Sequence, residues 1–246
     1  MTGKELRLSR IFRSDGKVGV FAFDHGQHFG TVEYPKGPIK IIQETVEGGI
    51  DALLLNPGMV KILKKDIFRK TGLIVRITGG ATAYSKESDF HSLLYDVDYA
   101  VSVGADMVVM MLILGSKREN EMISSISRCV KECDRLQIPL LVEVLSAISK
   151  EPVTKELALG SRVAFELGAD VIKTYYTGDD FNRIISAAKV PVIIAGGPKT
   201  DNIKDITKNA LQKGARGFAF GRNIFSSENP QNTVENLVKI VHTKGN

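Results

Sequence analysis

The most constraining feature of this chain is a strand-and-helix pattern that recurs eight times. Each unit has a short, continuously apolar segment and then a longer amphipathic segment that closes near a glycine. Continuous apolar strands are typical of a parallel sheet that is buried on both faces, and glycine commonly ends a helix. In chain order, the apolar segments end near residues 24, 56, 77, 112, 143, 173, 195 and 220.

Alternating strands and helices predict a parallel sheet. Eight units in 246 residues favour an α/β fold of the TIM-barrel type, a (β/α)8 barrel, with a short helical segment ahead of it at residues 4–12. An open, doubly wound sheet is the alternative. No linker or change of composition divides the chain, so residues 1–246 are predicted to form one domain.

Helices are expected between the strands, joined by short loops. A loop is expected at residues 30–37 and another at 78–82. Similar turns lead from helix to strand, with Gly-Ala-Asp at 104–106 and 168–170 and Gly-Ala-Arg at 214–216. The predicted helices are residues 38–47, 57–70, 88–103, 116–136, 154–167, 179–188, 201–213 and 230–242.

The sixth strand ends on a lysine, Lys173, within the sequence Val-Ile-Lys-Thr-Tyr-Tyr. Lysine is almost never fully buried unless it is paired, and burying its charge is costly. A desolvated or cation-flanked amine can instead attack a carbonyl group and form a Schiff base. Because the active sites of such barrels lie where the strands end, Lys173 is the predicted nucleophile.

The first strand ends on a second reactive residue, Asp24. Alternation along this strand points Asp24 and Ala22 into the barrel, whereas Phe21 and Phe23 face the helices. Lys173 should face the interior as well, and an aspartate nearby permits proton transfer while an imine forms. The alternative is a buried ion pair of Asp24 and Lys173 without any chemistry.

The residues beside these two are weaker candidates. Glu143 ends the fifth strand and is a second candidate acid or base, although it could equally orient Lys173 or a substrate hydroxyl. Tyr175 and Tyr176 follow the lysine, and packing within the loop is the favoured role for them. Lys199 is expected to be a solvated loop charge.

Glycines and an arginine follow the last two strands. Gly196 and Gly197 come after the seventh strand, and Gly221 and Arg222 after the eighth. In barrels this pair of loops often holds a phosphate through backbone N–H groups, glycine permits close approach, and an arginine adds a charge-assisted contact. The pattern predicts a phosphate site, with His25 beside Asp24 as a further contact to the substrate.

The net charge of +5, from 33 basic and 28 acidic residues, suits an anionic substrate. No basic run exceeds two residues, so nucleic acid is not an expected partner. No metal site is predicted, since His25 and His28 lack a third ligand at a convincing spacing, and no cofactor is predicted. No apolar run approaches the ~18 residues of a membrane span, and a signal peptide is not apparent, so a cytoplasmic protein is expected.

With these residues in place, the chain resembles the DhnA-type class I aldolase family. That family includes archaeal-type fructose-bisphosphate aldolases, 2-amino-3,7-dideoxy-D-threo-hept-6-ulosonate synthases and the thiolase of phosphorylated autoinducer-2. The resemblance implies that Lys173 forms the Schiff base, that Asp24 is its acid/base partner, and that Gly197, Gly221 and Arg222 hold the substrate phosphate. It also implies homo-oligomers, often decamers. The matching segments are residues 24–26, 171–176, 194–199 and 221–225.

One position departs from that family. Its aldolases and heptulosonate synthases carry a catalytic tyrosine just after strand five, where this chain has Leu145, which cannot exchange a proton. The thiolase branch also lacks the tyrosine and shares the two tyrosines after the lysine. The resemblance predicts a metal-independent class I aldolase acting on a phosphorylated ketose, such as fructose bisphosphate. The alternatives are a coenzyme A-dependent thiolase or transferase acting on a phosphorylated dione, and a non-catalytic phosphosugar-binding barrel.

Overall fold

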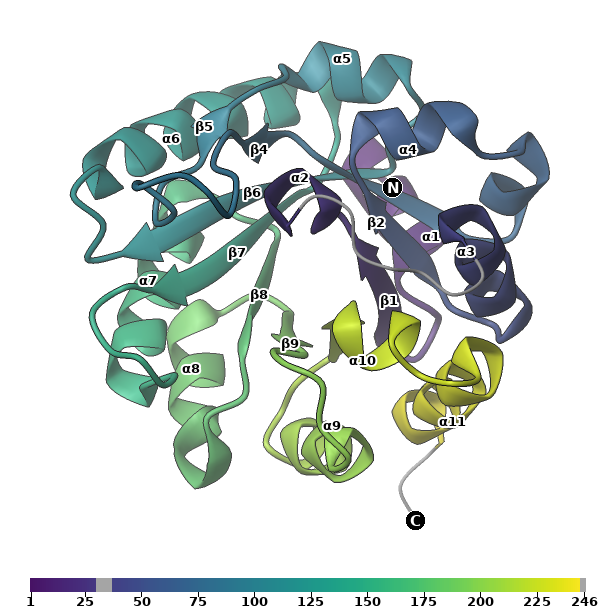
Figure 1. The fold of residues 1–246 in the computed structure, drawn as a ribbon. Helices are drawn as coiled ribbons and strands as arrows, with labels where there is room; N and C mark the ends of the chain where they lie inside the picture. The colour runs from purple at the N-terminus through teal and green to yellow at the C-terminus, as the bar shows by residue number, and fades with distance from the viewer. Residues whose placement is uncertain (30–36, 244–246) are drawn as a thin grey trace.

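A computed structural model describes residues 1–29 and 37–243, and these residues contain a closed barrel of eight parallel strands (Figure 1). Around the ring the strand order is β1-β10-β9-β8-β7-β6-β3-β2. The predicted (β/α)8 barrel is confirmed over the open sheet, because β1 pairs with both β10 and β2. The eight strands are β1 (Val18–Phe23), β2 (Ala52–Leu55), β3 (Gly72–Arg76), β6 (Met107–Leu114), β7 (Leu140–Ser146), β8 (Val171–Tyr175), β9 (Val192–Ala195) and β10 (Gly217–Phe220).

Helices surround the strands, and the predicted helices 38–47, 154–167 and 230–242 have the bounds that the sequence indicates. The predicted loop 30–37 falls, except for its last residue, outside the described ranges. The longer helices are α1 (Gly3–Ile11), α3 (Pro38–Glu47), α4 (Pro57–Ile62), α5 (Val97–Ser102), α6 (Glu119–Leu136), α7 (Thr154–Leu167), α8 (Phe181–Ala188), α9 (Ile203–Gln212) and α11 (Pro230–His242). The short ones are α2 (Gly26–Phe29), α10 (Arg222–Phe225) and the 3-10 turns η1 (Lys65–Arg69) and η2 (Gly178–Asp180).

Alternation along the strands divides the core into two clusters, as expected for a barrel. Val20 and Ala22 of β1 belong to the inner cluster, together with Val171 of β8. Phe21 and Phe23 belong to the larger cluster between the strands and the helices. The predicted orientation of β1 is therefore confirmed, and it directs Asp24 toward the barrel mouth.

The predicted helix 57–70 is interrupted. Helix α4 ends at Ile62, Leu63 is extended, and the chain resumes as a 3-10 turn, η1. Leu63 and Ile67 are both buried. The chain therefore breaks the helix at a residue that is itself part of the core, and Ile67 of the following turn is buried as well.

The predicted helix 88–103 is wrong over its first half. Strand β5 (Ser92–Leu93) pairs antiparallel with β4 (Thr78–Gly79), inside the segment expected to be a plain loop. The backbone N–H groups of Leu94 and Tyr95 both donate to the carbonyl of Ile77, at 2.8 and 3.2 Å. The helix begins only after Asp96, its N-cap. Tertiary hydrogen bonds at the end of β3 replace the local helix, and they bring residues 80–91 over the mouth.

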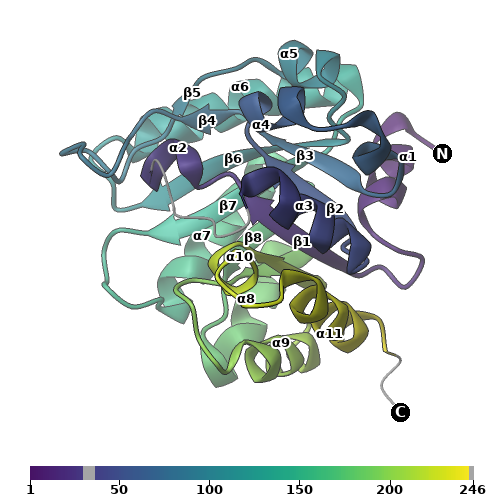
Figure 2. The ribbon, with the colours of Figure 1, turned by 45° about the vertical axis from the view of Figure 1, so that its right-hand side comes forward.

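Helix α1 lies at the opposite end of the barrel from α2 and the β4–β5 hairpin (Figure 2). Ile11 of this helix joins the inner cluster of the barrel. Lys4 forms an ion pair with Asp170, which accepts the backbone N–H of Leu140 at the start of β7 at 2.8 Å. The N-terminal helix therefore closes the end of the barrel where the strands begin. In the described part of the chain, no helix combines the length and apolar character needed to cross a membrane.

Candidate active site

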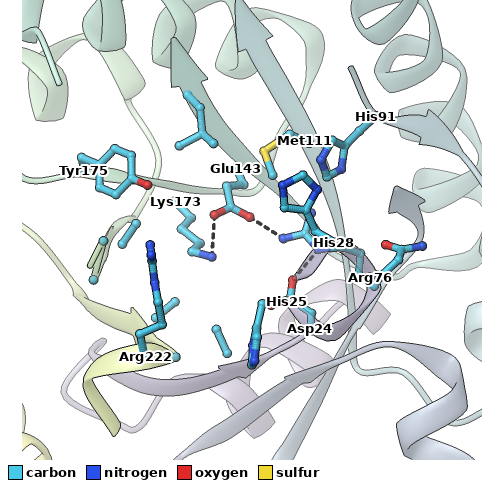
Figure 3. A pocket seen from close by; sticks show the side chains of 18 of the residues that line it. Asp24, His25, His28, Arg76, His91, Met111, Glu143, Lys173, Tyr175 and Arg222 are labelled. Atoms are coloured by element: carbon cyan, nitrogen blue, oxygen red, sulfur yellow. Dashed lines mark hydrogen bonds and ion pairs between the residues drawn. The ribbon is translucent and has the colours of Figure 1, made fainter. Parts of the chain in front are cut away.

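A cavity of about 290 Å³ opens where the barrel strands end (Figure 3). Its walls come from the ends of β1, β3, β6, β7, β8, β9 and β10, with α2 and the β4–β5 loop above them. The structure brings together every residue that the sequence indicated as a site candidate. These residues are Asp24, His25, Glu143, Lys173, Gly196, Gly197, Gly221 and Arg222.

A chain of ion pairs crosses the cavity floor. The Nζ atom of Lys173 lies 2.6 Å from Oε1 of Glu143. The other oxygen of Glu143 accepts a hydrogen bond from Nη2 of Arg76, and Nε of Arg76 donates to Oδ2 of Asp24. The suggested direct pair of Asp24 with Lys173 is therefore not the arrangement observed, because Arg76 and Glu143 lie between them.

Burial and charge act in opposite directions on this chain of ion pairs. Burial alone would raise the pKa of Glu143, but the positive charges of Lys173 and Arg76 lower that pKa well below its ordinary value. Burial alone would lower the pKa of Arg76, yet Asp24 and Glu143 raise it. Glu143 therefore stays ionised and Arg76 stays cationic at neutral pH.

Arg76 stands at a strand end in the sequence but was given no role in the predicted site, although it pairs with both Asp24 and Glu143. It ends β3 and is only 4% exposed. A charge at the end of an otherwise apolar strand was the available signal, as it was for Lys173. Its Nη1 atom is buried and has no hydrogen-bond partner in the part of the chain that the structure describes.

The loops after β9 and β10 are tied together by Asn223. Its side-chain amide donates to the carbonyls of Gly196 at 3.0 Å and Pro198 at 3.2 Å, and its carbonyl oxygen accepts the backbone N–H of Thr200 at 2.9 Å. Asn223 is buried within α10. These bonds hold the two glycine loops in one arrangement beside the cavity.

At two positions in these loops the backbone requires a glycine. Gly197 has a φ of 62°, in the left-handed region that favours glycine. A Cβ atom at Gly221 would lie 2.6 Å from the carbonyl oxygen of Ala22, so no side chain fits there. Arg222 follows directly and lines the same cavity. Gly197, Gly221 and Arg222 therefore lie together at this end of the cavity.

His25 lies between Asp24 and Arg222 in Figure 3. Its ring stacks on Phe225, with centroids 4.4 Å apart, and meets Phe23 edge-on. Burial lowers its pKa, and the positive charge of Arg222 lowers it further against the opposing effect of Asp24. His25 is therefore a neutral ring held in place by aromatic contacts.

The two tyrosines after the lysine have different positions. Tyr176 packs against Phe181, with ring centroids 5.3 Å apart, as expected for loop packing. Tyr175 instead lines the cavity beside Lys173, with its hydroxyl directed inward (Figure 3). Burial, together with the negative charge of Glu143, raises the pKa of Tyr175. Leu145 of β7 also lines the cavity, so this wall is apolar at the position where the resemblance leads one to expect a tyrosine.

The hairpin that replaced the predicted helix contributes Ser88 and His91 to the cavity. Burial, followed by the charge of Arg76, lowers the pKa of His91 to about 4. The Nδ1 atom of His91 is buried and has no hydrogen-bond partner among the described residues. No sequence signal placed this residue at the site, since the segment was expected to be helical. His28 of α2 also lines the cavity, and its ring nitrogen lies 2.9 Å from the carbonyl oxygen of Ala81.

A second cavity, of about 510 Å³, adjoins the first. The two share Tyr175, Arg222 and the Gly196–Gly197 loop as a common wall. Lys150 and Lys199 line the second cavity. Lys199 is exposed, as expected, and it donates to the carbonyl of Ser226 at 2.8 Å. Within residues 1–29 and 37–243, no three His, Cys, Asp or Glu side chains gather in a way that could hold a metal ion.

Residues 19–227 match the family described as DeoC/LacD family aldolase. An uncharacterized aldolase of Saccharolobus solfataricus is 32% identical over 260 residues, covering 98% of this chain and 95% of the relative. A 2-amino-3,7-dideoxy-D-threo-hept-6-ulosonate synthase of Archaeoglobus fulgidus is 31% identical over 248 residues, covering 98% and 92%.

A solved archaeal fructose-1,6-bisphosphate aldolase, with its catalytic lysine bound to the carbinolamine intermediate of its substrate, superposes with a TM-score of 0.89. It is 27% identical, and the match covers 98% of this chain and 100% of that one. The resemblance drawn from the motifs is confirmed. Family match, relatives and fold agree, and the chain belongs to the DeoC/LacD family of aldolases.

Proposed function

We propose that this protein is a metal-independent class I aldolase that cleaves or forms a phosphorylated ketose through an imine on Lys173. The observation that carries the proposal is the environment of Lys173, a buried amine 2.6 Å from Glu143 within a cavity that also contains the glycine loops and Arg222. The solved aldolases of similar fold, which form Schiff bases, support the same chemistry.

In the first step, the lone pair of Nζ of Lys173 adds to the ketone carbon, and a proton moves from this nitrogen to the carbonyl oxygen. The hydroxyl of this carbinolamine then takes up a further proton and leaves as water, which gives a protonated imine. Glu143 accepts the hydrogen bond that orients Nζ, and its negative charge remains beside the nitrogen when the iminium forms. Arg76 keeps Glu143 ionised and fixes the carboxylate plane through its own hydrogen bond.

In the second step, the hydroxyl two carbons from the iminium carbon loses its proton. The bond between the carbon that bears this hydroxyl and the carbon next to the iminium breaks. Its electron pair neutralises the iminium to give an enamine, and the carbon that bore the hydroxyl leaves as an aldehyde. Asp24 is the proposed base, because Arg76 engages its Oδ2 and leaves Oδ1 for proton transfer. Protonation of the enamine and hydrolysis of the imine then return Lys173 to its free form.

Tyr175 is the proposed replacement for the missing tyrosine. It lines the cavity from the same strand face as Lys173, two residues further along β8. Because its pKa is raised, it keeps its proton at neutral pH and acts as a neutral donor. This role would let the enzyme retain an acid with leucine at position 145.

The substrate phosphate is proposed to bind between the loops after β9 and β10. Gly196, Gly197 and Gly221 line the cavity there without side chains of their own, and Arg222 adds a positive charge. His25 would contact the substrate beside them. A phosphorylated sugar is therefore the proposed small-molecule partner. Homo-oligomers, decamers among them, and a cytoplasmic location stay predictions.

Borohydride trapping tests the proposal directly. Incubation with ketose phosphates and reduction should give a stable adduct, which peptide mass spectrometry would locate on Lys173. Lys173→Met should abolish it, whereas Lys208→Met, on the exposed side of α9, should leave it intact. Failure of every ketose phosphate to label Lys173 would reject the mechanism. Ligand-induced thermal stabilisation that survives Lys173→Met, with no turnover by the unaltered protein, would instead indicate a non-catalytic phosphosugar-binding barrel.

A second candidate is acyl transfer to coenzyme A from a phosphorylated dione. The adjoining cavity favours it, since that cavity meets the first at Tyr175 and Arg222 and presents Lys150 and Lys199 to an anionic second substrate. Turnover of a phosphorylated dione that requires coenzyme A would distinguish this reaction from aldol cleavage.

A further inference from the structure

The cavity has two ends that lie across the barrel from each other. In the ring of strands, β9 stands opposite β3, with β8, β7 and β6 between them on one side. The proposed phosphate loops follow β9 and β10, whereas Arg76 ends β3 and His91 comes from the hairpin that follows it. Arg222 and His91 accordingly lie on opposite sides of the Lys173–Glu143 pair in Figure 3. A linear ketose anchored by its phosphate would pass Lys173 and extend toward β3.

Two unpartnered polar atoms are found at this far end. Nη1 of Arg76 and Nδ1 of His91 are both buried, neither has a hydrogen-bond partner among residues 1–29 and 37–243, and both side chains line the cavity. Leaving a buried polar group unsatisfied costs about 1–3 kcal/mol. Buried polar groups in native proteins are nearly always paired. Two such atoms beside one cavity indicate that a ligand completes their hydrogen bonds.

The charges at the far end indicate what kind of ligand group fits. Asp24 and Glu143 already compensate Arg76, and His91 is neutral at physiological pH. Among the described residues that line the cavity, the lysines and arginines are Arg76, Lys173 and Arg222. A second phosphate here would meet two carboxylates and no uncompensated cation. An uncharged oxygen would meet a guanidinium donor and an imidazole nitrogen.

We propose that Arg76 and His91 form a distal subsite that binds an uncharged hydroxyl or carbonyl oxygen at the end of the ketose remote from its phosphate. This subsite selects ketose monophosphates over bisphosphates. A hydroxyl has the bonding capacity that both atoms require, since it can accept from Nη1 of Arg76 and can donate to, or accept from, Nδ1 of His91 according to the tautomer. The inference rests on the proposed function and narrows its substrate class.

Three ketose phosphates of different reach test the subsite. Dihydroxyacetone phosphate is too short to reach it, fructose 1-phosphate presents a distal hydroxyl, and fructose 1,6-bisphosphate presents a phosphate. The measurement is the concentration dependence of the borohydride adduct on Lys173, together with kcat/KM for the two six-carbon substrates. The unaltered enzyme should prefer the monophosphate over the bisphosphate by at least about tenfold, the effect of one lost hydrogen bond.

Variants of His91 separate binding at the distal subsite from general damage. His91→Leu should weaken the binding of fructose 1-phosphate about tenfold. It should leave the binding of dihydroxyacetone phosphate unchanged. His91→Asn, whose amide can occupy the place of Nδ1, should restore the binding of fructose 1-phosphate.

Equal weakening of both ligands by His91→Leu would overturn the proposal. Equal use of mono- and bisphosphate by the unaltered enzyme would also overturn it, and this comparison needs no variant to fold. If none of the three compounds labels Lys173, the proposed function falls as well. Labelling without selectivity rejects the distal subsite alone.

Discussion

The two ends of the barrel use the same kinds of charged residue in different ways. At the end where strands begin, carboxylates also bond to the backbone of a neighbouring strand. Asp51 accepts the backbone N–H of Gly19 at 2.6 Å while it pairs with Arg13 and His242. At the mouth, the carboxylates of Asp24 and Glu143 bond to the side chains of Arg76 and Lys173. Arg76 lies between them, and its Nη1 atom has no hydrogen-bond partner within the described ranges.

This difference separates stability from function. An aspartate at the closed end bonds both a backbone N–H and a cation, so its burial is compensated within the fold. At the mouth, unpaired polar atoms beside a cavity cost stability. Such incomplete pairing is reasonable where a ligand supplies the missing partner. The comparison therefore predicts that charges at the mouth control catalysis and those at the closed end control unfolding.

The largest effect is expected at the mouth. Glu143→Gln preserves shape and removes the negative charge beside the forming iminium, so single-turnover trapping on Lys173 should slow by roughly 10²–10³-fold, as for loss of a preorganised electrostatic partner. Rates should be normalised to folded protein by circular dichroism. Trapping as fast as in the unaltered enzyme would show that Glu143 only holds the fold together.

A smaller effect, on stability alone, is expected at the closed end. Asp106 accepts the backbone N–H of Leu73 at 2.9 Å and pairs with Arg10. Asp106→Ala leaves that N–H unsatisfied and should lower the free energy of unfolding in urea by about 1–3 kcal/mol. Its kcat/KM per folded molecule should match that of the unaltered enzyme. A catalytic loss as large as that of Glu143→Gln would remove the distinction between the two ends.

The smallest effect concerns pH. Burial opposes protonation of His242, but hydrogen bonds to Asp51 and Asp15 raise its pKa. A raised pKa in the folded state stabilises the protein below the unfolded value of about 6.5, and this contribution is lost as pH rises through the folded pKa. His242→Gln should therefore destabilise the protein by about 1 kcal/mol or less near pH 6 and by less near pH 9. Thermal melts across this range would measure the difference, and a constant difference would contradict the linkage.

Much of the fold was predictable because its signals are local. Apolar runs and glycine stops located the eight strands, and helices 38–47, 154–167 and 230–242 needed no correction. The wrong helix prediction also has a physical cause. Residues 88–96 form a hairpin segment because backbone N–H groups of Leu94 and Tyr95 bond to Ile77, a contact between segments that helical periodicity does not encode.

The sequence alone was enough to identify the reactive residues at the strand ends. Lys173, Asp24, Glu143 and the glycine loops were identified because a parallel barrel brings all its strand ends to one mouth. Their grouping in one cavity follows from that topology.

Only the tertiary structure decided who pairs with whom. It placed Arg76 between Asp24 and Glu143, turned Tyr175 inward, and brought His91 over the cavity. Pairing depends on distances between side chains from different strands, and alternation along one strand cannot determine them. A residue type and its place along a strand are local properties, whereas a hydrogen-bond partner is a property of the folded chain.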